Sequence, residues 1–213
     1  MKNTHQIQQW EGSFGREYTS RNPYLFDDTE ALYSKLYGVR RTEMNSEFIG
    51  QMDRSLKILE VGSNVGAQLI VLQNMGFSNL YGIELQEGAI EFSKTITRGI
   101  YIIKGSALDI PFKDHFFDMV FTSGVLIHIS PQDIAKAIQE IYRTSKKYIW
   151  GFEYFAEKFT EIEYRGEKNL LWKANYPDIY MKYFSDLHLV KERKFKYLQN
   201  DNRDQMYLLE KYS

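Results

Sequence analysis

The stretch Glu60–Gly66, EVGSNVG, decides how this sequence is expected to fold. It follows the apolar run Lys57–Val61, KILEV, which indicates a buried strand, and it precedes a helical segment that ends near Gly76. Glycine permits tight turns and lets a ligand approach the backbone closely. The helix after such a turn presents free N–H groups at its first residues. The stretch therefore predicts a strand–turn–helix unit that has room for a ligand.

Strands and helices alternate on the C-terminal side of this unit. Further strands are expected at about 80–84, 100–104, 117–122, 147–152, 189–198 and 204–211. Helices are expected at about 66–75, 87–97 and 178–186, and another begins where Ser130 can act as cap and Pro131 as first helical residue. The turn 199–202, QNDN, is typical of a hairpin. This order predicts an α/β fold: a Rossmann-like sheet of seven strands that closes with an antiparallel hairpin.

The N-terminal part of the chain has a different pattern. Residues 1–53 carry apolar side chains at helical spacing, as in Met44, Phe48 and Met52, and they lack strand-like runs. We therefore expect a helical extension, or lid, at 1–53 and the sheet-forming domain at 54–213.

Composition excludes several classes of function. The chain has 213 residues and a formal net charge of -1, so no overall field attracts nucleic acid or an anionic membrane. It has no cysteine, which excludes disulfides and thiolate metal sites and fits a cytoplasmic protein. Its four histidines lack paired spacing, so no metal site is expected. No apolar run reaches the roughly 18 residues of a membrane span.

Two positions argue against a nicotinamide cofactor in the glycine turn. The dinucleotide fingerprint G-x-G-x-x-G has Asn64 at its second glycine and Ala67 at its third. Glu84, at the end of the second expected strand, lies roughly 20 residues beyond the turn, where a carboxylate can accept both hydroxyls of a ribose. A bare turn and a solvated carboxylate are the alternatives. Together these residues favour a nucleoside ligand without a pyrophosphate.

Two later segments complete a pattern. Gly105–Phe112, GSALDIPF, follows the third expected strand, and Thr122–Ile129, TSGVLIHI, ends the fourth. With EVGSNVG and Glu84, they resemble the motifs of class I methyltransferases that use S-adenosylmethionine (SAM), over about residues 57–151. The resemblance implies cofactor contacts from Glu60, Gly62, Asn64, Gly66, Glu84, Leu85, Ser106, Ala107 and Thr122. Ser106 and Ala107 would meet the adenine, with Ser106 standing where the family usually has Asp.

His128 is the candidate general base. Methyl transfer mainly requires alignment of nucleophile, carbon and sulfur, and a hydroxyl or ammonium nucleophile also needs a proton acceptor. Histidine titrates near neutral pH, and His128 lies where the resemblance places the methyl group. A packing role for His128 is the alternative.

The stretch Trp10–Asn22, WEGSFGREYTSRN, combines aromatic, glycine and hydrogen-bonding residues. We expect a lid, with Tyr18 and Arg21 near the methionine carboxylate, since an arginine fork binds carboxylates well; plain packing is the alternative. With Asn169–Asp178, NLLWKANYPD, this stretch resembles a bacterial methylase group associated with pseudaminic acid biosynthesis. That resemblance implies a sugar or sugar-nucleotide acceptor, with Tyr154, Arg165, Trp172 and Tyr176 as candidate acceptor-binding residues.

Two other classes of function stay open. One is a SAM enzyme that acts on an amine, a small acid or an RNA base; the basic run Lys191–Lys196 keeps RNA in view, although such runs commonly protect edge strands. The other is a SAM-binding module without catalysis. The sequence leaves the oligomeric state open.

Overall fold

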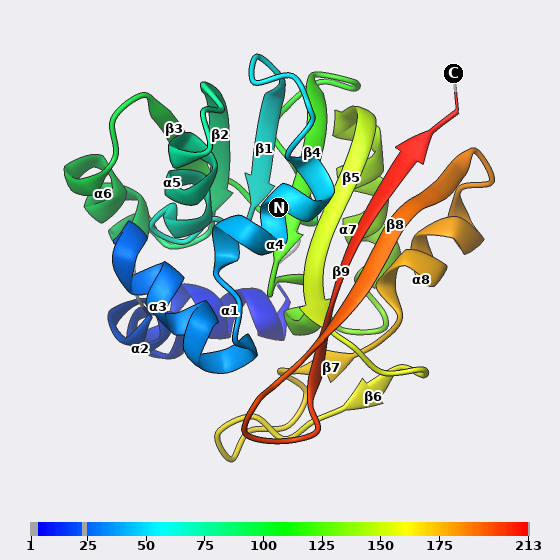
Figure 1. The fold of residues 1–213 in the computed structure, drawn as a ribbon. Coiled ribbons are helices and arrows are strands. Elements are labelled where there is room, and N and C mark those ends of the chain that lie inside the picture. The colour runs from blue at the N-terminus through cyan, green and yellow to red at the C-terminus, as the bar shows by residue number, and fades with distance from the viewer. Residues whose placement is uncertain (1–3, 23–24, 213) are drawn as a thin grey trace.

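The computed structural model describes residues 4–22 and 25–212 and has one central sheet flanked by helices (Figure 1). The helices are α1 (His5–Glu11), α2 (Ser13–Arg21), α3 (Phe26–Tyr37), α4 (Arg41–Ile49), α5 (Ala67–Asn74), α6 (Glu87–Ile96), α7 (Ile134–Thr144) and α8 (Tyr176–Tyr183), with the 3-10 turn η1 (Leu126–His128). The strands are β1 (Lys57–Val61), β2 (Asn79–Glu84), β3 (Ile100–Lys104), β4 (Phe117–Ser123), β5 (Ser145–Tyr154), β6 (Thr160–Glu161), β7 (Trp172–Lys173), β8 (Leu187–Lys196) and β9 (Arg203–Lys211).

The seven-stranded sheet confirms the expected fold class. Its strand order is β3-β2-β1-β4-β5-β9-β8. Strands β1 to β5 run parallel, whereas β9 is antiparallel to β5 and pairs with β8 as the predicted terminal hairpin. The chain leaves β1 toward β2 on one side and returns to β4 on the other. Such a reversal of strand order creates a crevice at the carboxyl ends of the strands, where α/β sheets bind ligands.

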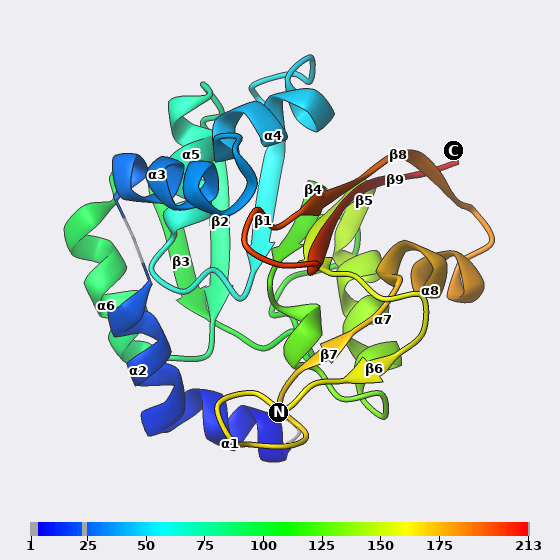
Figure 2. The same ribbon diagram turned by 60° about the horizontal axis from the view of Figure 1, so that its bottom comes forward.

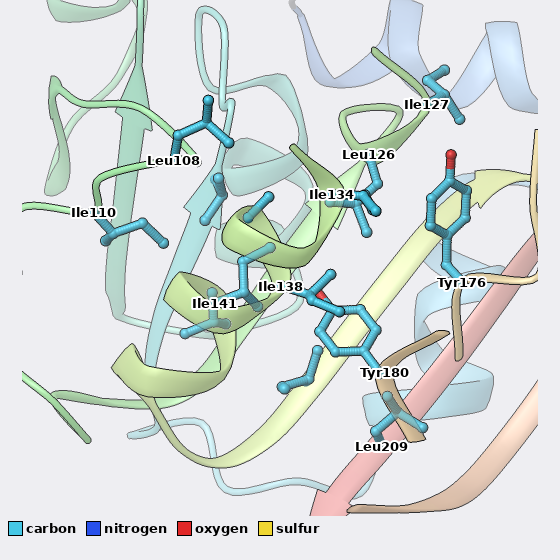
Figure 3. Packing of buried hydrophobic residues seen from close by; sticks show 14 of the residues in the cluster. Leu108, Ile110, Leu126, Ile127, Ile134, Ile138, Ile141, Tyr176, Tyr180 and Leu209 are labelled. Atoms are coloured by element: carbon cyan, nitrogen blue, oxygen red, sulfur yellow. The ribbon is translucent and has the colours of Figure 1, made fainter. Parts of the chain in front are cut away.

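Alternate residues of the buried strands supply two cores, one on each face. Ile58 joins the core formed with α3, α4, α5 and α6, whereas Leu59 joins the core formed with α7 and α8. Figure 3 shows the second core, in which Ile138 and Ile141 of α7 and Tyr180 of α8 lie close to Leu209 of β9. Because successive side chains point to opposite faces, a strand covered on both sides reads as a continuous apolar run.

The N-terminal helices have two different positions. Met44, Phe48 and Ile49 of α4 are buried in the core on one face of the sheet, so α3 and α4 are part of the packed fold. In contrast, α1 and α2 lie across the carboxyl ends of the strands (Figure 2). The predicted boundary at residue 53 stays a prediction.

Some local details differ from expectation. Helix α7 begins at Ile134, because 131–133 form a turn in which the Ser130 carbonyl accepts hydrogen bonds from Asp133 and Ile134. Helix α8 begins at Tyr176, two residues earlier than expected. The short pair β6–β7 was not expected, and it holds the segment between β5 and α8. In the described part of the chain, no helix combines the length and apolar character needed to cross a bilayer.

Candidate functional site

A cavity of about 240 Å³ lies at the carboxyl ends of β1, β2, β3 and β4. Residues of α1, α2 and α3 complete its lining. The sheet contributes Glu60, Gly62–Val65, Glu84–Gln86, Gly105–Leu108 and Ser123–Val125 to the lining. The structure therefore brings all four sequence motifs around one space at the predicted edge of the sheet, the fourth through Ser123–Val125, His128 and Ile129.

The glycine turn is held tightly against its neighbours. The N–H groups of Gly62 and Ser63 donate to the Ile83 carbonyl at 2.9 and 3.0 Å. Gly62 has a positive φ of 72°, and a Cβ atom there would approach Val125 to 2.7 Å. Gly66, with φ 90°, precedes α5 and lies outside the cavity lining. Gly62 therefore shapes the turn beside the cavity, whereas Gly66 serves the entry into α5.

Glu84 joins the glycine turn to the end of β2. One of its carboxylate oxygens accepts the Asn64 N–H at 2.8 Å, and the other accepts the N–H groups of Leu85 and Gln86 at 2.8 and 3.0 Å. Burial raises the pKa of Glu84, while these backbone hydrogen bonds act against the rise. Oε1 already accepts two N–H groups, whereas Oε2 accepts one, so Glu84 can hold the turn and still accept a hydroxyl group from a ligand through Oε2.

Several buried polar atoms of the lining have no partner in the described structure. They are the oxygens Glu60 Oε2, Ser63 Oγ, Asn64 Oδ1 and Gln68 Oε1, together with the donor Trp10 Nε1. Burial raises the pKa of Glu60 well above its usual value; Arg41 opposes this and Glu84 adds to it. Unsatisfied buried polar groups are costly, so a ligand that supplies hydrogen-bond donors would stabilise this region. The ammonium and ribose hydroxyl groups of SAM fit this acceptor-rich lining.

The segment after β3 forms the opposite wall. Ser106 and Ala107 both line the cavity, as does Leu85. The Ser106 hydroxyl accepts the Leu108 N–H at 3.1 Å, so it also braces its own loop. Thr122, by contrast, lies outside the lining and is buried within β4.

His128 lies in the lining as a buried, neutral imidazole. Its Nδ1 atom lies 2.7 Å from the Leu170 carbonyl oxygen, and burial lowers its pKa to about 4, although this hydrogen bond acts against the decrease. The carbonyl accepts only a protonated nitrogen, so Nδ1 carries the proton and Nε2 keeps its lone pair. Trp10 packs on the ring at a centroid distance of 4.5 Å, and Tyr164 lies 5.7 Å away.

The two residues predicted to bind the methionine carboxylate are separated. Tyr18 lines the cavity, and burial raises its pKa. Arg21, in the last turn of α2, lies outside the lining and pairs with Glu17 at 3.5 Å. The cation expected from the sequence is therefore not part of the cavity wall.

The four predicted acceptor-binding residues also lie outside the lining. Trp172 and Tyr176 are buried in the core, where the Tyr176 hydroxyl donates to the Trp172 carbonyl at 3.1 Å. Arg165 is exposed in a turn, and Tyr154 packs against Tyr197. Large aromatic side chains bury substantial apolar area, and this drives Trp172 and Tyr176 into the core.

The residues of the site that were not predicted from the sequence include Gln86, Arg41 and Glu153. Gln86 lines the cavity directly. Arg41 is fully buried and donates to Tyr33 and Ser123, which both line it. Glu153 is buried at the end of β5 and accepts the N–H groups of Val125 and Ile127 at 3.2 and 3.4 Å. A charged residue within the apolar run Ile149–Glu153, IWGFE, was the available signal for Glu153.

The basic side chains of the run Lys191–Lys196 are paired with acidic side chains. Lys191 and Arg193 of the basic run pair with Glu47, Lys194 pairs with Glu192, and Lys196 pairs with Asp201. This arrangement fits the predicted edge-strand role of the run. Within residues 4–22 and 25–212, no group of acidic or histidine side chains has a geometry that would hold a metal ion.

Comparisons with known proteins agree with this architecture. Residues 59–148 match the model of a family described as a methyltransferase domain. An uncharacterized protein of Haemophilus influenzae is 27% identical over 103 residues, which are 46% of this chain and 41% of that protein. The chain therefore spans about two fifths of the length of the curated relative it matches.

Solved structures share the fold at low sequence identity. A SAM-dependent methyltransferase of Leishmania major has a TM-score of 0.72 and 15% identity, covering 97% of this chain and 87% of that one. Magnesium protoporphyrin IX methyltransferase of Synechocystis PCC 6803, solved with bound SAM, has a TM-score of 0.68 and 13% identity and covers all of both chains. The 1,6-didemethyltoxoflavin-N1-methyltransferase of Burkholderia thailandensis has a TM-score of 0.65 and 10% identity, covering 81% of this chain and 76% of that one.

The sheet order and these neighbours define a Rossmann-like fold, and residues 59–148 of it match the methyltransferase-domain model.

Proposed function

We propose that this protein transfers the methyl group of SAM to a small-molecule acceptor. The observation that carries the proposal is the single cavity in which the glycine turn, Glu84 and His128 meet. Its carboxylate and amide oxygens suit the donors of the cofactor, and its neutral histidine suits removal of a proton from an acceptor. The other predicted lining residues, Asn64, Ser106 and Ala107, are assigned to the cofactor on the same grounds.

The chemistry requires little from the protein beyond placement and proton removal. When bound, SAM supplies a sulfonium methyl group; an incoming nucleophile bonds to this carbon while the carbon–sulfur bond breaks and its electron pair stays on sulfur. Nε2 of His128 accepts the proton of the acceptor's hydroxyl or ammonium group, because Nδ1 is engaged with Leu170. Helices α1 and α2 cover the cavity and exclude water.

For the acceptor, we propose a sugar or sugar nucleotide of the nonulosonic type. The support is the likeness of Trp10–Asn22 and Asn169–Asp178 to the pseudaminic acid-associated methylases. Trp10 and Tyr18 lie in the cavity lining, and Asn169 meets α1 through a hydrogen bond from Gln6. The second stretch therefore begins beside the helix that carries Trp10, and we assign the acceptor to this side of the cavity. A role in sugar biosynthesis in the cytoplasm follows from this assignment.

Two measurements test the proposal in sequence. Calorimetry with SAM should show stoichiometric binding, and an assay for methyl release should then give turnover with free sugars or sugar nucleotides. No binding of SAM would contradict the cofactor assignment. Binding without turnover across sugars, amines, small acids and RNA would favour a non-catalytic binding module.

A further inference from the structure

A buried arginine beneath the cavity lacks a counter-charge. Arg41 has no exposed surface, and its guanidinium packs on the rings of Phe152 and Tyr33 at 4.5 and 4.9 Å. Among residues 4–22 and 25–212, the structure gives it no ion pair with a carboxylate. The nearest acidic influences are Glu60 and Asp204. Burying a charge without a close partner is costly, so an anion supplied by a ligand would stabilise this arrangement.

Two hydroxyl groups connect Arg41 to the cavity. Its guanidinium donates to the Tyr33 hydroxyl at 3.0 Å and to Ser123 Oγ at 3.4 Å, and both residues line the cavity. Since both hydroxyls accept from the guanidinium, their own O–H protons remain to donate to a ligand. Arg41 thus makes this part of the wall a charge-assisted donor.

Acceptor atoms lie directly beside this donor. Gln68 donates from Nε2 to the Tyr33 hydroxyl at 3.4 Å, and its own Oε1 is buried without a partner. Glu60 Oε2 is likewise unpartnered. An anion-binding group and a cation-binding group therefore lie side by side near the glycine turn. This pairing is complementary to the carboxylate and ammonium of an α-amino acid.

We propose that Arg41, acting through Tyr33 and Ser123, is the cation that receives the α-carboxylate of the cofactor's methionine part. The inference rests on the proposed function, because it takes SAM as the ligand. A carboxylate on the acceptor is the other source of such an anion. The position next to the glycine turn, where Gln68 of α5 contacts Tyr33 of α3, favours the cofactor. Arg41 then replaces Arg21 as the carboxylate partner predicted from the sequence.

The test compares SAM with decarboxylated SAM, which differs from it only in lacking this carboxylate. Calorimetry without any acceptor ensures that only the cofactor's carboxylate contributes. The wild type should bind SAM more tightly than the decarboxylated form, on the order of tenfold to a hundredfold. Arg41→Met and Tyr33→Phe should weaken SAM binding and leave binding of the decarboxylated form unchanged. The ratio of the affinity for SAM to the affinity for decarboxylated SAM should therefore fall toward one.

Matched variants separate a positioning role from a structural one. Arg40→Met removes the neighbouring arginine, which is exposed and paired with Glu43, and should keep the wild-type ratio. Tyr33→Phe carries the test if Arg41→Met does not fold. A wild type that binds both forms equally, or variants that keep the full ratio, would overturn the inference while the proposed cofactor stands. The inference would also be overturned if Arg21→Met, and not Arg41→Met, brought the affinities for SAM and decarboxylated SAM to the same value. Failure of the wild type to bind either form would overturn the proposed function and the inference together.

Discussion

The Nδ1 atom of His128 lies 2.7 Å from the carbonyl oxygen of Leu170, which is 42 residues further along the chain. This contact joins the segment after β4 to the segment before β7, and it fixes which ring nitrogen carries the proton. A histidine held in this way is oriented by the backbone, and its Nε2 atom is left for a ligand. The contact therefore connects the tertiary fold to the proposed proton transfer.

His128→Ala should lower turnover by about a hundredfold to ten-thousandfold, with little change in SAM affinity, because it removes the proposed proton acceptor. Rates at saturating substrate and calorimetry with SAM measure the two quantities. His128→Asn is the matched variant, since its amide can still donate toward Leu170 but lacks Nε2. Turnover near the wild-type level in either variant would assign the proton to another group or to solvent.

Glu84→Gln should weaken SAM binding by roughly tenfold to a hundredfold. The amide removes the negative charge, and its NH₂ group cannot accept the N–H groups that the carboxylate accepts from Asn64, Leu85 or Gln86. Calorimetry measures the affinity, and thermal unfolding reports the loss of turn stability separately. Glu87→Gln, an exposed change three residues on, should bind SAM normally. Unchanged affinity in Glu84→Gln would remove the proposed ribose contact.

Trp10→Ala should lower turnover and increase hydrogen exchange in α1, because Trp10 packs against His128, Phe14 and Tyr18. Trp10→Phe keeps an aromatic ring but removes the indole N–H, which is buried without a partner. If Trp10 only covers the cavity, Trp10→Phe should have the turnover and the hydrogen exchange in α1 of the wild type. If the indole also binds an acceptor, Phe should restore protection of α1 and leave the KM for the acceptor raised. Wild-type exchange and turnover in Trp10→Ala would contradict a covering role for α1.

Glu153 should make stability depend on pH. Burial raises its pKa to about 7 in the folded protein, against hydrogen bonds from the backbone of 125–127. The folded state therefore holds a proton that the unfolded state has released between about pH 4.5 and 7. The stabilising contribution is complete below about pH 4.5 and is lost as pH rises through 7. Relative to Glu153→Gln, the wild type should lose on the order of 3 kcal/mol between pH 4.5 and 8.

Denaturant unfolding of the two proteins across this pH range measures the difference. Other titrating groups, such as Asp204 and His128, are common to both proteins and cancel to first order. A constant difference in unfolding free energy at all pH values would show that Glu153 does not change protonation in this window.

The sequence by itself determined the sheet and the side of it that holds the site. Strands, helices and the glycine turn are encoded locally, by apolar runs, caps and special φ angles, and these positions were predicted within a few residues. The edge of the sheet follows from the chain order, because parallel strands place their carboxyl ends together. Glu84, Ser106 and His128 were predicted as site residues for this reason: Glu84 ends a strand, and Ser106 and His128 each come after one.

Only the tertiary structure decided which side chains from outside the motifs reach the cavity. Arg21 and Arg41 are both arginines near the ends of N-terminal helices, and no local pattern distinguishes them; packing of α4 on the sheet buries Arg41 beneath Tyr33, while α2 leaves Arg21 in solvent. Trp172 and Tyr176 resembled ligand-binding aromatics, yet burial of their rings in the core determines their position. Such outcomes depend on contacts between residues far apart in the chain, which the spacing of residue types does not encode.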